Sequence, residues 1–78
     1  MIHVDIYKSF GDYIRLSRIQ SGLSQEELAK KLGISQPYYS RIEAGMRAVD
    51  LKLACKMCDV LHLDFGEFLK NHKKMCEH

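Results

Sequence analysis

Residues 22–45 decide the fold of this chain, and they read GLSQEELAKKLGISQPYYSRIEAG. Ser24 and Glu27 have the spacing of a capping box, which marks the start of a helix. In that motif the Ser24 hydroxyl accepts the Glu27 amide, while the Glu27 carboxylate reaches back to the Ser24 amide. Gly33 is a natural helix stop. The pattern therefore predicts a helix over residues 24–32.

A second short helix is expected directly after it. Ser35 is the predicted N-cap, and Pro37 lies in the first turn, where a missing backbone N–H costs nothing. Gly45 ends this helix, which we expect over residues 35–44. Two short helices joined by a tight turn have the spacing of a helix-turn-helix, whose second helix lies in the major groove of DNA.

The rest of the chain also favours helices over strands. Apolar residues recur at helical spacing over residues 8–20 and 50–61, and a last helix is expected from Asp64 onward. Residues 2–6 alternate with period two, which leaves a short strand open there. The fold class is therefore all-α with five helices. The predicted core residues of the helices over residues 8–20, 24–32 and 50–61 are Phe10, Ile14, Leu28, Ala29, Leu32, Leu51, Ala54, Cys55, Cys58 and Leu61.

Length and charge point to one small binding module. The 78 residues are 46% hydrophobic and 28% charged, which is a globular composition for a single domain. We expect that domain over residues 8–70, with short extensions at 1–7 and 71–78. The net charge is only +2, but residues 8–47 hold seven basic and four acidic residues. The positive excess thus lies around the helix-turn-helix.

Other classes of protein are disfavoured. There is no apolar run long enough for a membrane span and no secretory signal, so we expect a cytoplasmic protein without a membrane partner. Cys55 and Cys58 have C-x-x-C spacing, but they fall in an apolar helical stripe, where core packing is favoured over metal or redox chemistry. Cys76 is the expected exposed thiol. We predict no enzyme activity, since no nucleophile, base and orienting group stand together. We also expect no metal, no cofactor and no small-molecule ligand.

The run 22–45 resembles the Cro/C1-type (XRE-like) helix-turn-helix regulators of bacteria and phages almost position by position. The resemblance extends from about Phe10 to Leu69. It implies a compact lambda-repressor-like DNA-binding domain of five helices, with the helix-turn-helix at the second and third. It also implies that Gln25 contacts a DNA phosphate and that the outer face of helix 35–44 reads bases.

Side-chain chemistry fits those implied roles. Glutamine can bond bidentately to adenine and arginine to guanine, which suits Gln36 and Arg41, while Arg47 is a candidate phosphate clamp. The predicted DNA-binding residues are Gln25, Gln36, Pro37, Tyr38, Ser40, Arg41 and Arg47.

Four further residues and one loop are interpreted through the resemblance. Arg18 and Glu43 correspond to a buried ion pair that ties the first helix to the third, so a structural role is favoured over DNA contact. Tyr39 stands where Ile or Leu is usual, and we expect it in the core with its hydroxyl at the surface. Ser17 replaces a usual leucine, and loop 46–49 has fewer basic residues than relatives carry.

One recognition helix reads only a few base pairs, so specific binding needs two copies of the chain. We therefore predict a homodimer on a pseudo-palindromic operator. The last helix carries an apolar stripe that we favour as the dimer interface; the alternative is that the stripe only closes the monomer. The expected function is a repressor-like, sequence-specific transcriptional regulator that binds double-stranded DNA. The alternative is a protein-interaction module, antitoxin-like or an adaptor. The predicted interface residues are Phe65, Phe68, Leu69 and Met75.

Overall fold

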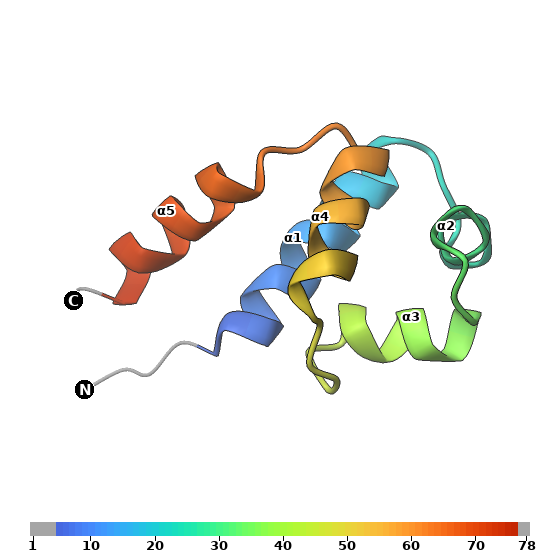
Figure 1. Ribbon diagram of the computed structural model, residues 1–78, viewed down its shortest axis with the longest axis horizontal. Coiled ribbons are helices and arrows are strands. Elements are labelled where there is room, and N and C mark those ends of the chain that lie inside the picture. Colours follow the sequence, from blue (N-terminus) through green and yellow to red (C-terminus); the bar gives the residue numbers. More distant parts are fainter. Residues whose placement is uncertain (1–4, 77–78) are drawn as a thin grey trace.

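The structure is a computed structural model that describes residues 5–76 of the chain, and the side chains of residues 5–74. This range is all-α, as the sequence predicts, and contains five helices and no strand (Figure 1). Helical structure reaches beyond both limits of the expected 8–70 domain, and those limits stay a prediction. The helices are α1 Ile6–Gln20, α2 Gln25–Leu32, α3 Gln36–Glu43, α4 Leu51–Val60 and α5 Phe65–Cys76.

The local signals around α2 and α3 are confirmed. The Ser24 hydroxyl accepts the Glu27 amide at 3.0 Å, and the Glu27 carboxylate accepts the Ser24 amide at 3.0 Å. Gly33 ends α2 with a φ of 73°, a left-handed conformation that glycine adopts without strain. Ser35 caps α3 by accepting the Tyr38 amide at 3.2 Å. Local hydrogen bonds thus fix both ends of the turn between the two helices.

Helix α1 begins earlier than the sequence predicts. Asp5 is its N-cap and accepts the Tyr7 amide at 2.9 Å, so Ile6 is helical and does not continue a strand; residues 1–4 lie outside the described range. Near its middle, α1 passes very close to the end of α3. A Cβ at Gly11 would lie only 2.5 Å from the Glu43 carbonyl oxygen. Only glycine therefore allows this approach of the two helices.

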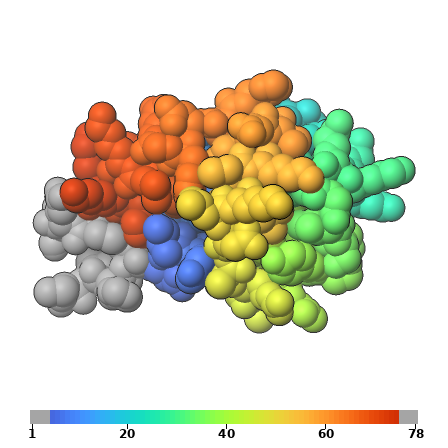
Figure 2. Space-filling view, in the orientation of Figure 1, coloured from blue at the N-terminus to red at the C-terminus, as the bar shows by residue number. Residues whose placement is uncertain are grey.

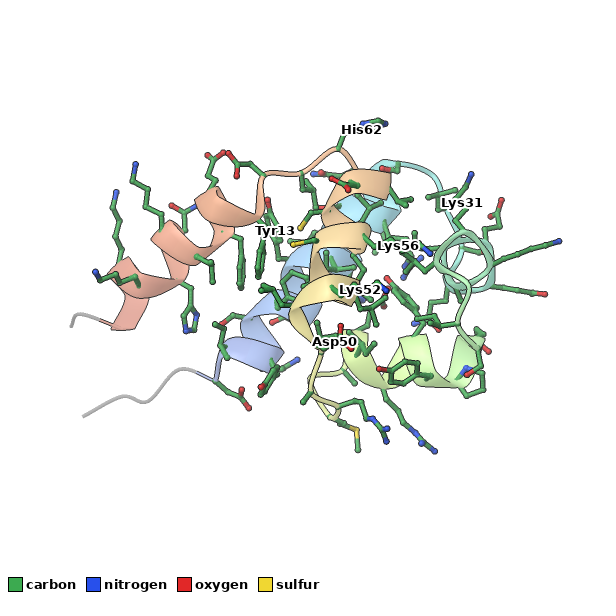
Figure 3. The ribbon with its side chains drawn as sticks, in the orientation of Figure 1. Tyr13, Lys31, Asp50, Lys52, Lys56 and His62 are labelled. Atoms are coloured by element: carbon green, nitrogen blue, oxygen red, sulfur yellow. The ribbon has the colours of Figure 1, made fainter. Side chains whose placement is uncertain are left out.

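The core gathers side chains from all five helices. The expected residues of α1 and α2 are buried, and Ala54, Cys58 and Leu61 are also confirmed. Two expectations in α4 are wrong, because Leu51 is 69% exposed and Cys55 is exposed, whereas Met57 is fully buried. Apolar residues surround much of α4, and packing against the neighbouring helices, α2 and α5 among them, decides which of these residues are buried. Lys56 of α4 reaches α2 and donates to the Leu32 carbonyl at 3.2 Å (Figure 3).

Helix α5 lies at the opposite end of the molecule from α2 and α3 (Figures 1 and 2). Its Phe68 is only 6% exposed and meets the Phe10 ring edge-on, with the two centroids 5.2 Å apart. Phe65 is half-buried, and Leu69 is 41% exposed. Phe68 therefore closes the core of this chain, as in the monomer-closing alternative.

None of the helices described in residues 5–76 combines the length and apolarity of a membrane span.

Candidate nucleic-acid interface

Helix α3 turns one face into the protein and the other to solvent. Tyr39, Ile42 and Glu43 are buried. The predicted base-reading residues lie on the opposite side, where Gln36, Pro37 and Arg41 are exposed and Ser40 is half-buried. The buried positions hold α3 against α1 and α2, and the exposed ones are free to meet a ligand. The expected outer face of the helix is therefore present.

The inner face is anchored by the predicted ion pair. Arg18 Nε donates to Glu43 Oε2 at 2.6 Å, and Arg18 Nη2 donates to Oε1 at 3.3 Å. Arg18 Nη1 also donates to the Leu23 carbonyl at 2.8 Å, so the guanidinium ties three segments together. The Arg18 side chain is 12% exposed and that of Glu43 is 4% exposed. A bidentate, dehydrated pair of this kind fixes geometry more than an exposed pair does.

Tyr39 joins this pair, which corrects one expectation. The ring is in the core as predicted, but its hydroxyl is not at the surface: the residue is fully buried, and the hydroxyl donates to Glu43 Oε2. A buried phenol needs a hydrogen-bond partner, and the carboxylate one helical turn along α3 supplies it. Burial, followed by the hydrogen bond to Glu43, raises the pKa of Tyr39. The phenol therefore stays protonated as a donor.

Glu43 remains ionised in these surroundings. Burial works to raise its pKa, but hydrogen bonds from Arg18, Tyr39 and Gln25 outweigh burial and leave the pKa below its ordinary value. The hydrogen bond to Glu43 also raises the pKa of Arg18, against the opposing effect of burial. Both members of the pair are therefore charged over the whole neutral range.

Gln25 links the buried pair to the outer face of α3. Its Nε2 donates to Glu43 Oε1 at 3.0 Å, and its Oε1 accepts from Gln36 Nε2 at 2.9 Å. Two residues that the sequence assigned separately to phosphate and base contact are thus bonded to each other. Each amide keeps one N–H bond beyond these contacts. Sequence spacing gave no sign of this connection.

Arg47, the predicted phosphate clamp, lies beside Tyr38. Its guanidinium carbon is 5.3 Å from the centre of the Tyr38 ring, which is a cation–π distance. Arg47 is exposed, whereas Tyr38 is half-buried against the core. The aromatic ring thus supports a loop cation next to the exposed face of α3.

Helix α1 adds cations that the sequence analysis missed. Lys8 and Arg15 line a hollow of about 300 Å³ together with Gln25 and Ser40, two predicted DNA-binding residues. The Lys8 ammonium pairs with Asp12 at 3.2 Å. Arg15 stands one helical turn before Arg18, and that spacing was the available signal, since residues one turn apart share a helix face.

The cysteines and the predicted dimer residues lie elsewhere. Cys58 is buried, and burial raises the pKa of its thiol to about 11. Within the described residues, no three His, Cys, Asp or Glu side chains gather where they could hold a metal ion. The side chains of Cys76 and Met75 lie outside the described residues.

An apolar groove of about 210 Å³ runs between the start of α1, α4 and α5. Its walls include Ile6, Tyr7, Leu51 and Phe65. Ile6, Tyr7 and Leu51 are all exposed in this chain. The groove therefore combines two predicted interface residues, Phe65 and the buried Phe68, with apolar residues that the sequence analysis did not assign to an interface.

Comparison with known proteins identifies the family. The helix-turn-helix family matches residues 14–68. The chain is 33% identical over 61 residues to YqaE of Bacillus subtilis (strain 168), an HTH-type transcriptional regulator, covering 78% of this chain and 53% of YqaE. It is 30% identical over 59 residues to YqaF of the same organism, also an HTH-type transcriptional regulator, covering 76% of this chain and 78% of YqaF. It thus spans only about half of YqaE.

A solved structure of a regulatory protein also resembles this chain. The restriction-modification controller protein C.AhdI from Aeromonas hydrophila is 34% identical and superposes with a TM-score of 0.73, over 80% of this chain and 94% of that one. YqaE and YqaF are thus transcriptional regulators, and C.AhdI is a controller protein. The matched residues include all of α2, α3 and α4. The chain belongs to the Cro/C1-type helix-turn-helix family of DNA-binding transcriptional regulators.

Proposed function

We propose that this chain binds a pseudo-palindromic operator as a homodimer, with α3 in the major groove, and regulates transcription in a repressor-like manner. The observation that carries the proposal is that one face of α3 is buried and the opposite face is exposed. Its inner face is locked by Tyr39, Ile42 and Glu43, and Gln36 and Arg41 stand on the open outer face. A rigid helix with exposed donors and acceptors is what direct readout requires.

The exposed side chains match base edges. Arginine donates bidentately to guanine, and glutamine pairs with adenine, so Arg41 and Gln36 would each read one base pair. A good bidentate contact discriminates by about 1–3 kcal/mol. Ser40 and Pro37 flank them and would contribute weaker contacts, with Pro37 offering only apolar surface.

Phosphate contacts would come from both sides of α3. Arg47 stands beyond its end, stacked on Tyr38. Arg15 and Gln25 stand beside it across the hollow that also contains Ser40. Contacts to phosphates position a protein on DNA without reading sequence, and they make its affinity fall with added salt.

The dimer would place two α3 helices one turn of DNA apart, about 34 Å, on the two half-sites. Leu69 and the half-buried Phe65 retain exposed surface, whereas Phe68 is buried in the core of the chain. These are the predicted interface residues whose side chains the structure describes. The exposed Tyr7 and Leu51 at the neighbouring groove would add apolar area to the same end of the molecule.

In-vitro selection of double-stranded DNA at a fixed salt concentration tests this function. We expect enrichment of a two-fold symmetric site with half-sites one helical turn apart. Sedimentation of the free chain at micromolar concentration should give twice the chain mass of 9.0 kDa. If selection enriches no sequence, operator binding is wrong; if the chain sediments only as a monomer with and without DNA, the homodimer is wrong.

A protein-interaction module, antitoxin-like or an adaptor, is the second candidate function. It is favoured by exposed apolar residues of α1, since Leu16 and Ile19 are more than half exposed and lie outside the groove described above. Contiguous apolar surface that a homodimer leaves open would indicate a protein partner. Hydroxyl-radical labelling of side chains in the dimer separates the two functions, because protection of the Leu16 and Ile19 side chains would leave no such surface.

A further inference from the structure

The start of α1 is held directly against the end of α3. A Cβ at Gly45, in the loop that follows α3, would lie only 2.7 Å from the Lys8 Cα. Three residues further along α1, a Cβ at Gly11 would lie 2.5 Å from the Glu43 carbonyl oxygen. Segments of backbone in such close contact leave each other little room to move. The Lys8 side chain therefore begins at a fixed place beside the helix that we propose for the major groove.

Three charged residues of α1 line the hollow beside α3. Lys8, Asp12 and Arg15 are four and three residues apart, so they share one face of the helix. The hollow of about 300 Å³ also contains Gln25 and Ser40, two residues that are proposed to meet DNA. The phosphates of a bound operator would therefore pass close to this face of α1.

Asp12 neutralises one of the two cations. The Lys8 ammonium donates to Asp12 Oδ1 at 3.2 Å. Glu43, the other carboxylate of the hollow, is buried and already paired with Arg18. Because Lys8 and Asp12 cancel each other, the net positive charge that the hollow offers to a phosphate is that of Arg15.

The Lys8–Asp12 pair contributes little to the fold. Its two side chains are 59% and 57% exposed, and water screens an ion pair of this kind. Its consequence lies instead in the charge that the protein presents to DNA. A lysine that neutralises a phosphate releases a condensed counterion and so adds to affinity. Lys8 can do this only by leaving Asp12, whose carboxylate would then face the phosphates without its partner.

We propose that Asp12 is a positioning residue that withholds Lys8 from the operator phosphates and thereby limits the affinity of this chain for DNA. The inference rests on the proposed operator binding and adds to it a residue that weakens binding. Phosphate contacts carry no sequence information, so Asp12 lowers the affinity for every sequence alike and leaves the preference between sequences unchanged.

The test compares the full chain with Asp12→Asn, which keeps the size of the side chain and removes its charge. Asp59→Asn, on the exposed side of α4 and outside the hollow, is the matched control because it changes the net charge equally. Lys8→Gln, alone and combined with Asp12→Asn, completes a double-mutant cycle. Dissociation constants for a selected operator and for a scrambled duplex are measured over a range of salt concentrations.

We expect Asp12→Asn to bind both duplexes about three- to tenfold more tightly at about 0.15 M salt, because Lys8 becomes free to neutralise a phosphate. The slope of the logarithm of affinity against that of salt should steepen by about 0.9, the contribution of one phosphate. Lys8→Gln alone should stay within about twofold of the unmodified chain, since its cation is already neutralised, and the combined variant should lose the gain.

Three results would overturn this role of Asp12 while leaving operator binding intact. The first is a gain in Asp12→Asn no larger than in Asp59→Asn. The second is a gain that persists in the combined variant, because Asp12 would then not act through Lys8. The third is a changed ratio between operator and scrambled duplex in Asp12→Asn, which would place Asp12 in base reading. If the unmodified chain selects no operator at all, the proposed function itself is wrong, and the role of Asp12 with it.

Discussion

Truncation of Glu43 is the most informative perturbation of stability. Glu43→Ala removes a carboxylate that is 4% exposed and accepts from Arg18, Tyr39 and Gln25. The Arg18 guanidinium then keeps only its bond to the Leu23 carbonyl among these partners, although its side chain is 12% exposed. Removing one member of a buried pair costs about 3–5 kcal/mol, because the other charge is left unpaired away from water.

That loss is large against the stability of so small a domain. A chain below about 80 residues gains only about 3–5 kcal/mol of net stability from a single core. We therefore expect Glu43→Ala to be largely unfolded at 25 °C or to melt at least about 12 °C lower, at about 4 °C or more for each kcal/mol. Glu26→Ala removes an exposed glutamate of α2 and should change stability by less than about 0.5 kcal/mol.

Urea unfolding followed by helical circular dichroism measures these free energies of unfolding. The cycle is completed with Arg18→Met and with Arg18→Met combined with Glu43→Ala. The double variant should lose about 0.5–3 kcal/mol less than the two single losses together, because no charge is then left without its partner. If Glu43→Ala unfolds within about 1 kcal/mol of Glu26→Ala, the ion pair does not hold α1 to α3 and the reasoning is refuted.

Three other predictions address packing, DNA contact and pH. Gly11→Ala should destabilise the fold by about 1–3 kcal/mol in the same urea assay, because its methyl group would overlap the Glu43 carbonyl; equal stability would show that the helices can separate freely. Arg41→Ala should relax selection at one base position, whereas Arg47→Ala should weaken all operators alike and flatten the dependence of affinity on salt; identical effects of the two changes would contradict the assigned roles. Because the pKa of Glu43 is lowered on folding, its stabilisation is complete above the ordinary glutamate pKa of about 4.3 and is lost as pH falls through the lower folded-state value. Between pH 6 and pH 2 the unmodified chain should therefore lose more stability than Glu43→Gln, and parallel loss would contradict this.

Much of the fold could be predicted because its signals are local. Ser24, Glu27 and Ser35 act within one helical turn of their own position, and Gly33 needs no distant partner to end α2. The same holds for the outer face of α3, since a short amphipathic helix has one face to bury. The Arg18–Glu43 pair is a long-range contact, and it came from resemblance to a family and not from any local rule.

The faces of α4 and α5 could not be predicted in the same way. Apolar residues stand on several sides of α4, so periodicity did not show that Met57 is buried while Leu51 and Cys55 are exposed. The apolar stripe of α5 was equally ambiguous, and only packing against Phe10 shows that Phe68 belongs to the core. Where a helix has more apolar residues than one face can bury, packing against the neighbouring helices determines which face is buried.

By itself, then, the sequence determined the helix boundaries around the turn, the family and the kinds of side chain offered to DNA. Only the tertiary structure decided how those side chains are connected. Gln25 lies between Glu43 and Gln36 because α2 packs against α3, and the Tyr39 hydroxyl donates to Glu43 because both residues are buried on the inner face of α3. Hydrogen-bond direction depends on which donor meets which acceptor in space, and spacing along a chain does not contain that information.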